Sequence, residues 1–157
     1  MKVYIFFFIT IVSLNCFGQH QSNKNFLYGG SIGYTNQSGN FGKVGAFGMY
    51  GFGNNNLSII KVDINANITG MQNKVTVIPE IGTTYYFIPS RLAVAGFFVE
   101  TELTPYTFTP KAGISLLSII DLGIGYGSEI QQKKDFKSIK GLQFSLGINI
   151  PFNFNIY

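Results

Sequence analysis

Apolar and polar residues alternate along most of the chain, and the alternation is strictest near its end. From position 142 to position 156 every even residue is apolar, and the odd residues between them are Gln, Ser, Gly, Asn or Pro. A period of two predicts a β-strand with one apolar and one polar face. The segment is longer than an ordinary strand of about five or six residues.

Seven segments upstream follow the same period. The regular ones are 26–34, 60–68, 75–87, 108–116 and 120–126, and the less regular ones, whose polar face is interrupted by apolar residues, are 41–52 and 91–103. Clusters rich in Gly, Asn, Ser and Pro separate the segments, as turns require. The sequence therefore predicts an all-β fold, an eight-stranded antiparallel up-and-down barrel. Proline removes a ladder donor, so Pro79, Pro110 and Pro151 require bulges or strand ends.

The first residues have the layout of a secretory signal peptide. Lys2 precedes an apolar run at 3–14 that is too short to span a bilayer as a helix. Small residues at 16 and 18 fit a cut after Gly18. We therefore expect a signal peptide at 1–18 and one barrel domain at 19–157.

Cys16 is the only cysteine of the chain and lies within this leader. Acylation of Cys16 is an alternative to cleavage after Gly18, although Asn15 stands where a lipoprotein motif has a small residue. If Cys16 is removed with the leader, the exported chain has no disulfide, no thiolate metal ligand and no cysteine nucleophile.

The low proportion of charged residues indicates whether the apolar faces of the strands point into the barrel or out to lipid. Only 11% of residues are charged, against about 25% in a typical soluble domain. A soluble barrel would turn its apolar face inward and carry many charges outside. Here the polar faces are mostly Gly, Ser, Asn and Thr, which suit a narrow interior. We therefore expect the apolar faces to meet lipid, in a transmembrane barrel; the alternative is a soluble periplasmic barrel that binds an apolar ligand.

Aromatic residues cluster at the expected strand ends, as two girdles of a transmembrane barrel would require. One end has Phe26, Tyr28, Tyr50, Phe52, Tyr85, Phe87, Phe152, Phe154 and Tyr157. The other end has Tyr34, Phe41, Tyr106, Phe108 and Tyr126. The end with the fewer aromatics also has the longest expected loop, 128–140, as the outer side of such a barrel would.

On these patterns the sequence resembles the small outer-membrane β-barrel family of Gram-negative bacteria, of the OmpA/OmpX-like eight-stranded type. The resemblance implies placement in the cell outer membrane, with membrane lipid and the barrel assembly machinery as partners. That machinery reads a terminal aromatic residue in phase with the outward face of the last strand. Tyr157 supplies the aromatic, one position out of phase with Phe154 and Ile156.

The parity that turns apolar residues outward turns six charged residues inward. They are Lys43, Lys61, Asp63, Glu80, Lys111 and Asp121, three of each sign. Buried charges must be paired, so a balanced set predicts a lumen plugged by ion pairs, with Glu80 and Lys111 as one pair. The alternative is a narrow porin-like channel, with Glu100 and Glu102 adding acid near the outer mouth.

The sequence offers no set of residues for catalysis, metal binding or a cofactor. His20 is the only histidine, and a net charge of +4 is too small to indicate a nucleic-acid partner. The basic loop with Lys133, Lys134, Phe136 and Lys137 is the best candidate for an outer contact, either with a partner or with anionic lipid headgroups. We therefore expect a non-enzymatic barrel with a structural role or an interaction through its outer loops.

Overall fold

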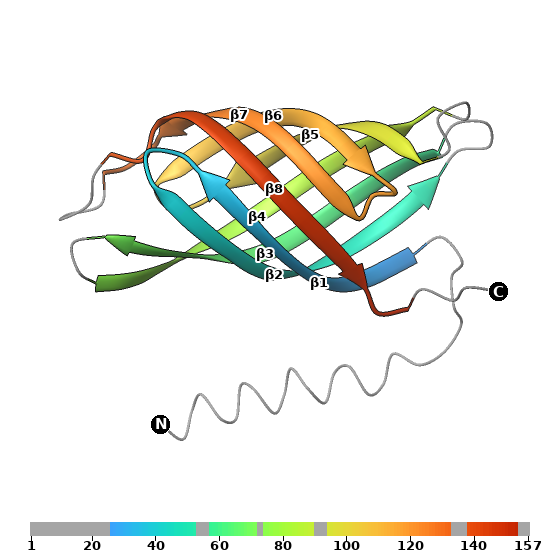
Figure 1. Cartoon of the computed structure of the whole chain (residues 1–157), viewed down its shortest axis with the longest axis horizontal. Coiled ribbons are helices and arrows are strands. Elements are labelled where there is room, and N and C mark those ends of the chain that lie inside the picture. The colour runs from blue at the N-terminus through green and yellow to red at the C-terminus, as the bar shows by residue number, and fades with distance from the viewer. Residues whose placement is uncertain (1–25, 53–56, 72–73, 90–93, 133–137, 154–157) are drawn as a thin grey trace, which may run out of the picture.

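The computed structural model is a closed barrel of eight antiparallel strands in sequence order (Figure 1). It describes residues 26–52, 57–71, 74–89, 94–132 and 138–153. The strands are β1 (Phe26–Asn36), β2 (Asn40–Phe52), β3 (Leu57–Met71), β4 (Lys74–Ile88), β5 (Ala95–Leu103), β6 (Thr107–Leu116), β7 (Ile120–Glu129) and β8 (Gly141–Pro151). No helix in these ranges is long and apolar enough to span a membrane.

The strands are staggered, so a path along paired residues does not return to its start. From Phe26 the path crosses seven strands, reaches Phe144 in β8 and returns to β1 at Asn36, ten residues further on. A stagger of ten over eight strands corresponds to a strand tilt of about 40°. Such a barrel is just wide enough for its own side chains to fill it.

Alternation along each strand sorts apolar and polar residues between the two faces, as the sequence predicts. In β3, Ile64 is 65% exposed on the outer surface, whereas its neighbours Asp63 and Asn65 are 3% and 6% exposed inside the barrel. In β8 likewise, Asn149 is buried inside the barrel and its neighbour Ile148 lies on the opposite face of the strand. The outer surface is therefore apolar and the lumen largely polar.

The ends of the barrel differ in their connections. The β3–β4 hairpin extends furthest, because β4 pairs with β5 only from Ile81 onward while it pairs with β3 from Lys74 (Figure 1). At the opposite end the β6–β7 turn is tight, and Leu117 and Ser118 both have positive φ, at 55° and 56°. Positive φ at both central residues is typical of a hairpin turn whose twist matches the strands.

The three strand prolines lie where a ladder hydrogen bond is missing. Pro79 is in the part of β4 beyond its pairing with β5, and Pro151 is the last residue of β8. Pro110 lies at a break in the β6–β7 ladder, between the pairs Phe108↔Ser128 and Lys111↔Gly125. The register is the same on both sides of that break, so no bulge is needed.

The last strand is shorter than its sequence pattern predicts. β8 ends at Pro151 instead of continuing to position 156, and residues 154–157 lie outside the described part. The side chain of Asn153 continues the pairing in place of backbone: it accepts a hydrogen bond from Tyr28 N and donates one to Phe26 O. An amide side chain thus stands in for a peptide group at the barrel end.

Inside the barrel, apolar residues gather at both ends of a polar middle. The larger group lies near the β6–β7 turn and contains Phe47, Met49, Ile59, Tyr86, Ile88 and Phe98. The smaller contains Phe41, Ile78 and Ile139, with Tyr106 packed against it. The prediction that Phe41 belongs to the outer aromatic girdle is therefore wrong: it shares the inward parity of Lys43 and is 5% exposed.

Candidate functional site: a charged lumen

A chain of alternating charges crosses the lumen between β2, β4, β5 and β6. Nζ of Lys43 lies 2.5 Å from Oε1 of Glu80 and also contacts Glu102. Glu102 in turn lies 2.7 Å from Nζ of Lys111, which lies 3.0 Å from Glu100. Each lysine therefore holds two carboxylates, and the chain begins and ends with an acid.

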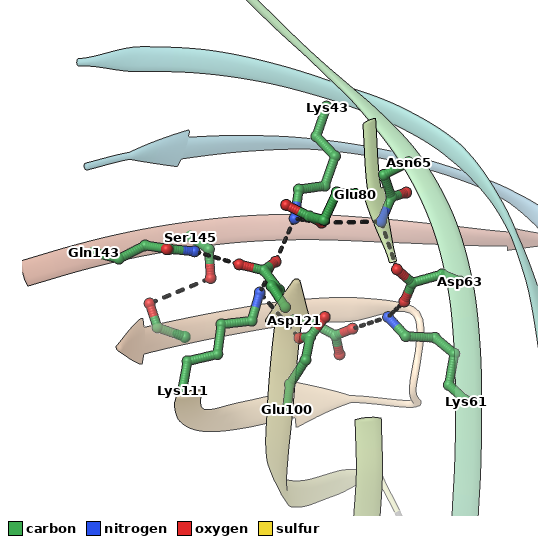
Figure 2. A network of polar contacts seen from close by, with 12 residues as sticks. Lys43, Lys61, Asp63, Asn65, Glu80, Glu100, Lys111, Asp121, Gln143 and Ser145 are labelled. Carbon is green, nitrogen blue, oxygen red and sulfur yellow. Dashed lines mark hydrogen bonds and ion pairs between the residues drawn. The ribbon is translucent and has the colours of Figure 1, made fainter. Parts of the chain in front are cut away.

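A second, shorter row of charges lies beside the first, and in it too a lysine stands between acids. Nζ of Lys61 lies 3.3 Å from Asp63 and 3.7 Å from Asp121. The lysine also lies 5.7 Å from the centre of the Tyr86 ring, within reach of a cation–π interaction. Figure 2 shows Lys43, Lys61 and Lys111 entering from different sides of the lumen, with the carboxylates between them.

Neutral donors satisfy the carboxylate oxygens that the lysines leave. Asp121 accepts hydrogen bonds from Tyr86 Oη at 2.7 Å, Ser115 Oγ at 2.6 Å and Asn149 Nδ2 at 2.8 Å. Asn65 links the two charge chains, because its Nδ2 donates to Asp63 at 2.5 Å and to Glu80 at 3.2 Å.

Two further amides complete the first chain. Asn67 Nδ2 donates to Glu80 at 2.7 Å, and Gln143 Nε2 donates to Glu102 at 2.6 Å. Hydrogen bonds to charged groups are stronger than those between neutral groups. These amide donors therefore replace part of the hydrogen bonding with water that the carboxylates lose on burial. The result is one connected polar network that draws on most of the strands.

The network is not balanced in charge, contrary to the sequence prediction. Glu100 and Glu102, which only the porin-like alternative had counted as lumenal acids, are 6% and 3% exposed within the network. Five acids therefore face three lysines, and each charge chain has one acid in excess. The predicted pair is also wrong: among the ion pairs of the described residues none joins Glu80 to Lys111, because Lys43 and Glu102 stand between them.

Little space remains around these side chains. A cavity of about 40 Å³ lies among the three lysines, and one of about 30 Å³ lies between Glu80, Glu102 and the Phe41 group. Each has room for a few water molecules at most, since one water needs roughly 10–15 Å³ on this measure. The charged middle of the lumen is therefore filled by side chains.

Several network residues are not among the six predicted from the sequence. Asn65, Asn67, Tyr86, Gln143 and Asn149 all have inward parity, which the alternation already indicated. The sequence prediction did not include them because it considered charged residues only. The signal that would find them is a polar side chain at an inward position.

Other predicted features have a simpler outcome. Lys133, Lys134, Phe136 and Lys137, like the leader at 1–18, lie outside the described residues. Within the described ranges, no group of three or more His, Cys, Asp and Glu residues is placed to hold a metal ion.

Comparison with known proteins identifies no relative of this chain. No protein-family model matches the chain, and neither curated proteins nor solved structures give a match. The fold and the site define the class without such help: a closed eight-stranded antiparallel β-barrel, apolar outside, with a buried ion-pair network in its lumen.

Proposed function

We propose that this protein is an outer-membrane β-barrel of a Gram-negative cell, with a structural role or an interaction through its outer loops. The observation that carries the proposal is the parity of the strands. Large apolar side chains such as Ile64, Val99 and Ile124 are more than half exposed on the outside, while charged residues are buried inside. An apolar surface of this extent is unfavourable in water and favourable in lipid.

Aromatic contacts at one barrel end support the same placement. On the outer surface Tyr28 lies between Phe26 and Phe152, with ring centroids 6.5 and 6.4 Å away. Phe52 lies between Tyr50 and Tyr85 in the same manner. Such bands fit the membrane–water interface, where one side of each ring meets hydrocarbon and the other meets headgroups.

The lumen favours a plug over the porin-like alternative. Ions would have to pass through the paired network, and its cavities hold only a few waters. Opening a path would break several buried ion pairs at once, at a cost of several kcal/mol for each uncompensated charge. The soluble alternative, a periplasmic barrel carrying an apolar ligand, would need its apolar parity turned inward, opposite to the arrangement of Ile64 and Asp63.

The proposal includes the leader and the outer loops. The signal at 1–18 would direct export, the assembly machinery would insert the barrel, and outer-membrane lipid would surround it. The basic loop with Lys133, Lys134 and Lys137 would then lie on the outer side, against anionic headgroups or a partner. No enzymatic activity, cofactor or nucleic-acid partner is proposed.

Fractionation of cells expressing the full chain tests the placement. We expect the protein in the detergent-soluble outer-membrane fraction, with faster gel migration before heating than after, as folded transmembrane barrels show. Recovery in the periplasmic fraction without detergent would instead support the soluble alternative. Planar-bilayer recordings test the plug: steady, large conductance would contradict it.

A further inference from the structure

The outer wall of the barrel has two hollows of similar size but different chemistry. The first, of about 470 Å³, lies over β2 and β3 around Ala46, and every side chain that lines it is aliphatic or aromatic. The second, of about 530 Å³, lies over β4 to β7, and its lining includes Thr83, Thr101, Pro110 and Ala112. Hydrocarbon chains of lipid suit the first hollow, whereas the second also contains hydroxyl groups.

The two threonines form a cross-strand pair within the apolar wall. Thr83 of β4 lies directly opposite Thr101 of β5, and both side chains are exposed on the outside. On the same face of its strand, Thr101 stands between Val99 and Leu103, which are 57% and 50% exposed. Other outward Ser, Thr, Asn and Gln residues of the described strands lie within two positions of a strand end. In these strands, only this pair places small hydroxyl groups inside the apolar part of the wall.

The two hydroxyls lack a partner of their own. Neither makes a hydrogen bond within the part of the chain that the structure describes. In water they would bond to solvent, but a lipid chain offers neither donor nor acceptor, and a hydroxyl left unpaired in an apolar medium is unfavourable. A hydroxyl can both donate and accept. A second copy of the same surface therefore supplies the partners that lipid does not.

We propose that this hollow is the contact surface of a homodimer, in which Thr83 and Thr101 of one copy hydrogen-bond with the same residues of the other. Such a contact is two-fold symmetric, and the same patch serves both copies. Small residues such as Ala112 let the two walls approach closely, as small residues do between helices in lipid. The inference rests on the membrane placement proposed above, because the two hydroxyls lack water as a partner only in hydrocarbon.

Energy transfer between donor-labelled and acceptor-labelled copies in lipid vesicles measures the dimer. The labels are attached to Leu117→Cys, in the exposed β6–β7 turn, in a Cys16→Ser background. We expect transfer that saturates with the protein-to-lipid ratio, as a dimer requires. Thr83→Val combined with Thr101→Val keeps the side-chain shape and removes both hydroxyls, so it should weaken the dimer on the order of tenfold. An unchanged affinity in this double variant would overturn the proposal.

A matched pair of variants tests whether the second hollow is the contact. Ala112→Phe fills it and should abolish the saturable transfer, whereas Ala46→Phe makes the same change in the first hollow and should dimerise as the parent does. Slower gel migration after heating than before shows that both variants are folded. Equal transfer in the two would overturn the proposal.

Two further outcomes separate failure of the dimer from failure of the membrane placement. Flotation of the parent chain with the vesicles tests the placement alone, and a chain that does not float refutes it. If the parent floats but its transfer falls in proportion to the lipid added, the copies meet only by chance. Lipid would then fill the second hollow, and the dimer would be refuted while the placement stands.

Discussion

Two parts of the same lumen are stabilised in different ways. The charged middle, with its three lysines and five acids, depends on each lysine holding two carboxylates. The apolar end around Phe98 depends on packing, in which each side chain contributes by the surface it buries. Tyr86 belongs to both, since its ring packs 5.9 Å from that of Phe98 and its hydroxyl donates to Asp121.

Burial alone therefore does not say how a part of the interior is stabilised. Both parts are equally hidden from water, but losing one partner has different consequences in each. In the apolar end a truncation leaves a cavity, to which the neighbours can partly adjust. In the charged middle the loss of one lysine leaves carboxylates without compensation. Four substitutions test this difference.

The largest effect is expected from Lys43→Met, which removes a central cation of the network. Glu80 would lose its only ion-pair partner among the described residues, and Glu102 one of its two. We expect the free energy of unfolding to fall by about 4 kcal/mol, measured by urea titration of the folded barrel in lipid vesicles. Lys74→Met, at the exposed start of β4, is the matched control. Equal effects of the two would contradict the network.

The next effect is expected from Phe98→Ala in the apolar end. Removing a ring that is 3% exposed and packed on Tyr86 should lower the free energy of unfolding by about 3 kcal/mol. Phe97→Ala, on the outward face of the same strand, should cost clearly less in the same urea titration. If Phe97→Ala were the costlier of the two, the assignment of inner and outer faces in β5 would be wrong.

An intermediate effect is expected from Gly113→Ala in the barrel wall that both parts share. A Cβ atom there would lie 2.0 Å from the carbonyl oxygen of Leu122, so the backbone would have to move. We expect a loss of about 2 kcal/mol. Gly70→Ala is the control because no atom lies within 4 Å of its added Cβ. A loss at Gly70 as large as at Gly113 would show that close packing of the wall is not the cause.

The smallest effect is expected from Asp63→Asn, which removes an acid where acids are in excess. Lys61 and Asp121 would remain as a balanced pair, so the free energy of unfolding should change by no more than about 1 kcal/mol. Lys61→Met should be much more destabilising, since it leaves both aspartates unpaired. Comparable losses in Asp63→Asn and Lys61→Met would contradict the unequal charge count.

Strand parity made most of the fold predictable. Alternation assigned Ile64 outward and Asp63 inward from the sequence alone, and the structure confirms both the eight strands and their faces. The end of β8 was not predictable in this way, because alternation continues to position 156. β8 ends at Pro151, one more backbone hydrogen bond follows from Phe152 N to Tyr28 O, and the side chain of Asn153 then makes the next contacts with β1.

Of the site, the sequence predicted the three lysines and three of the five acids, but not the pairs that they form. Parity placed Lys43, Lys61 and Lys111 in the lumen, but which acid meets which lysine depends on the stagger between strands. That stagger brings Glu102 of β5 between Lys43 and Lys111, a contact that the sequence of β5 alone does not predict. Register is set by pairing between strands around the whole barrel. Alternation within one strand shows which face a residue lies on, but not how that strand is shifted against its neighbours.

Spin-label accessibility along β3 tests the claim that the outward apolar face of the barrel meets lipid. Single cysteines at positions 60–68, introduced in a Cys16→Ser background, would be labelled and measured in lipid vesicles. The claim predicts that labels at even positions collide with oxygen, most strongly near Ile64, and are shielded from a water-soluble nickel complex. Nickel accessibility at Ile64 as high as at an exposed loop position would contradict it.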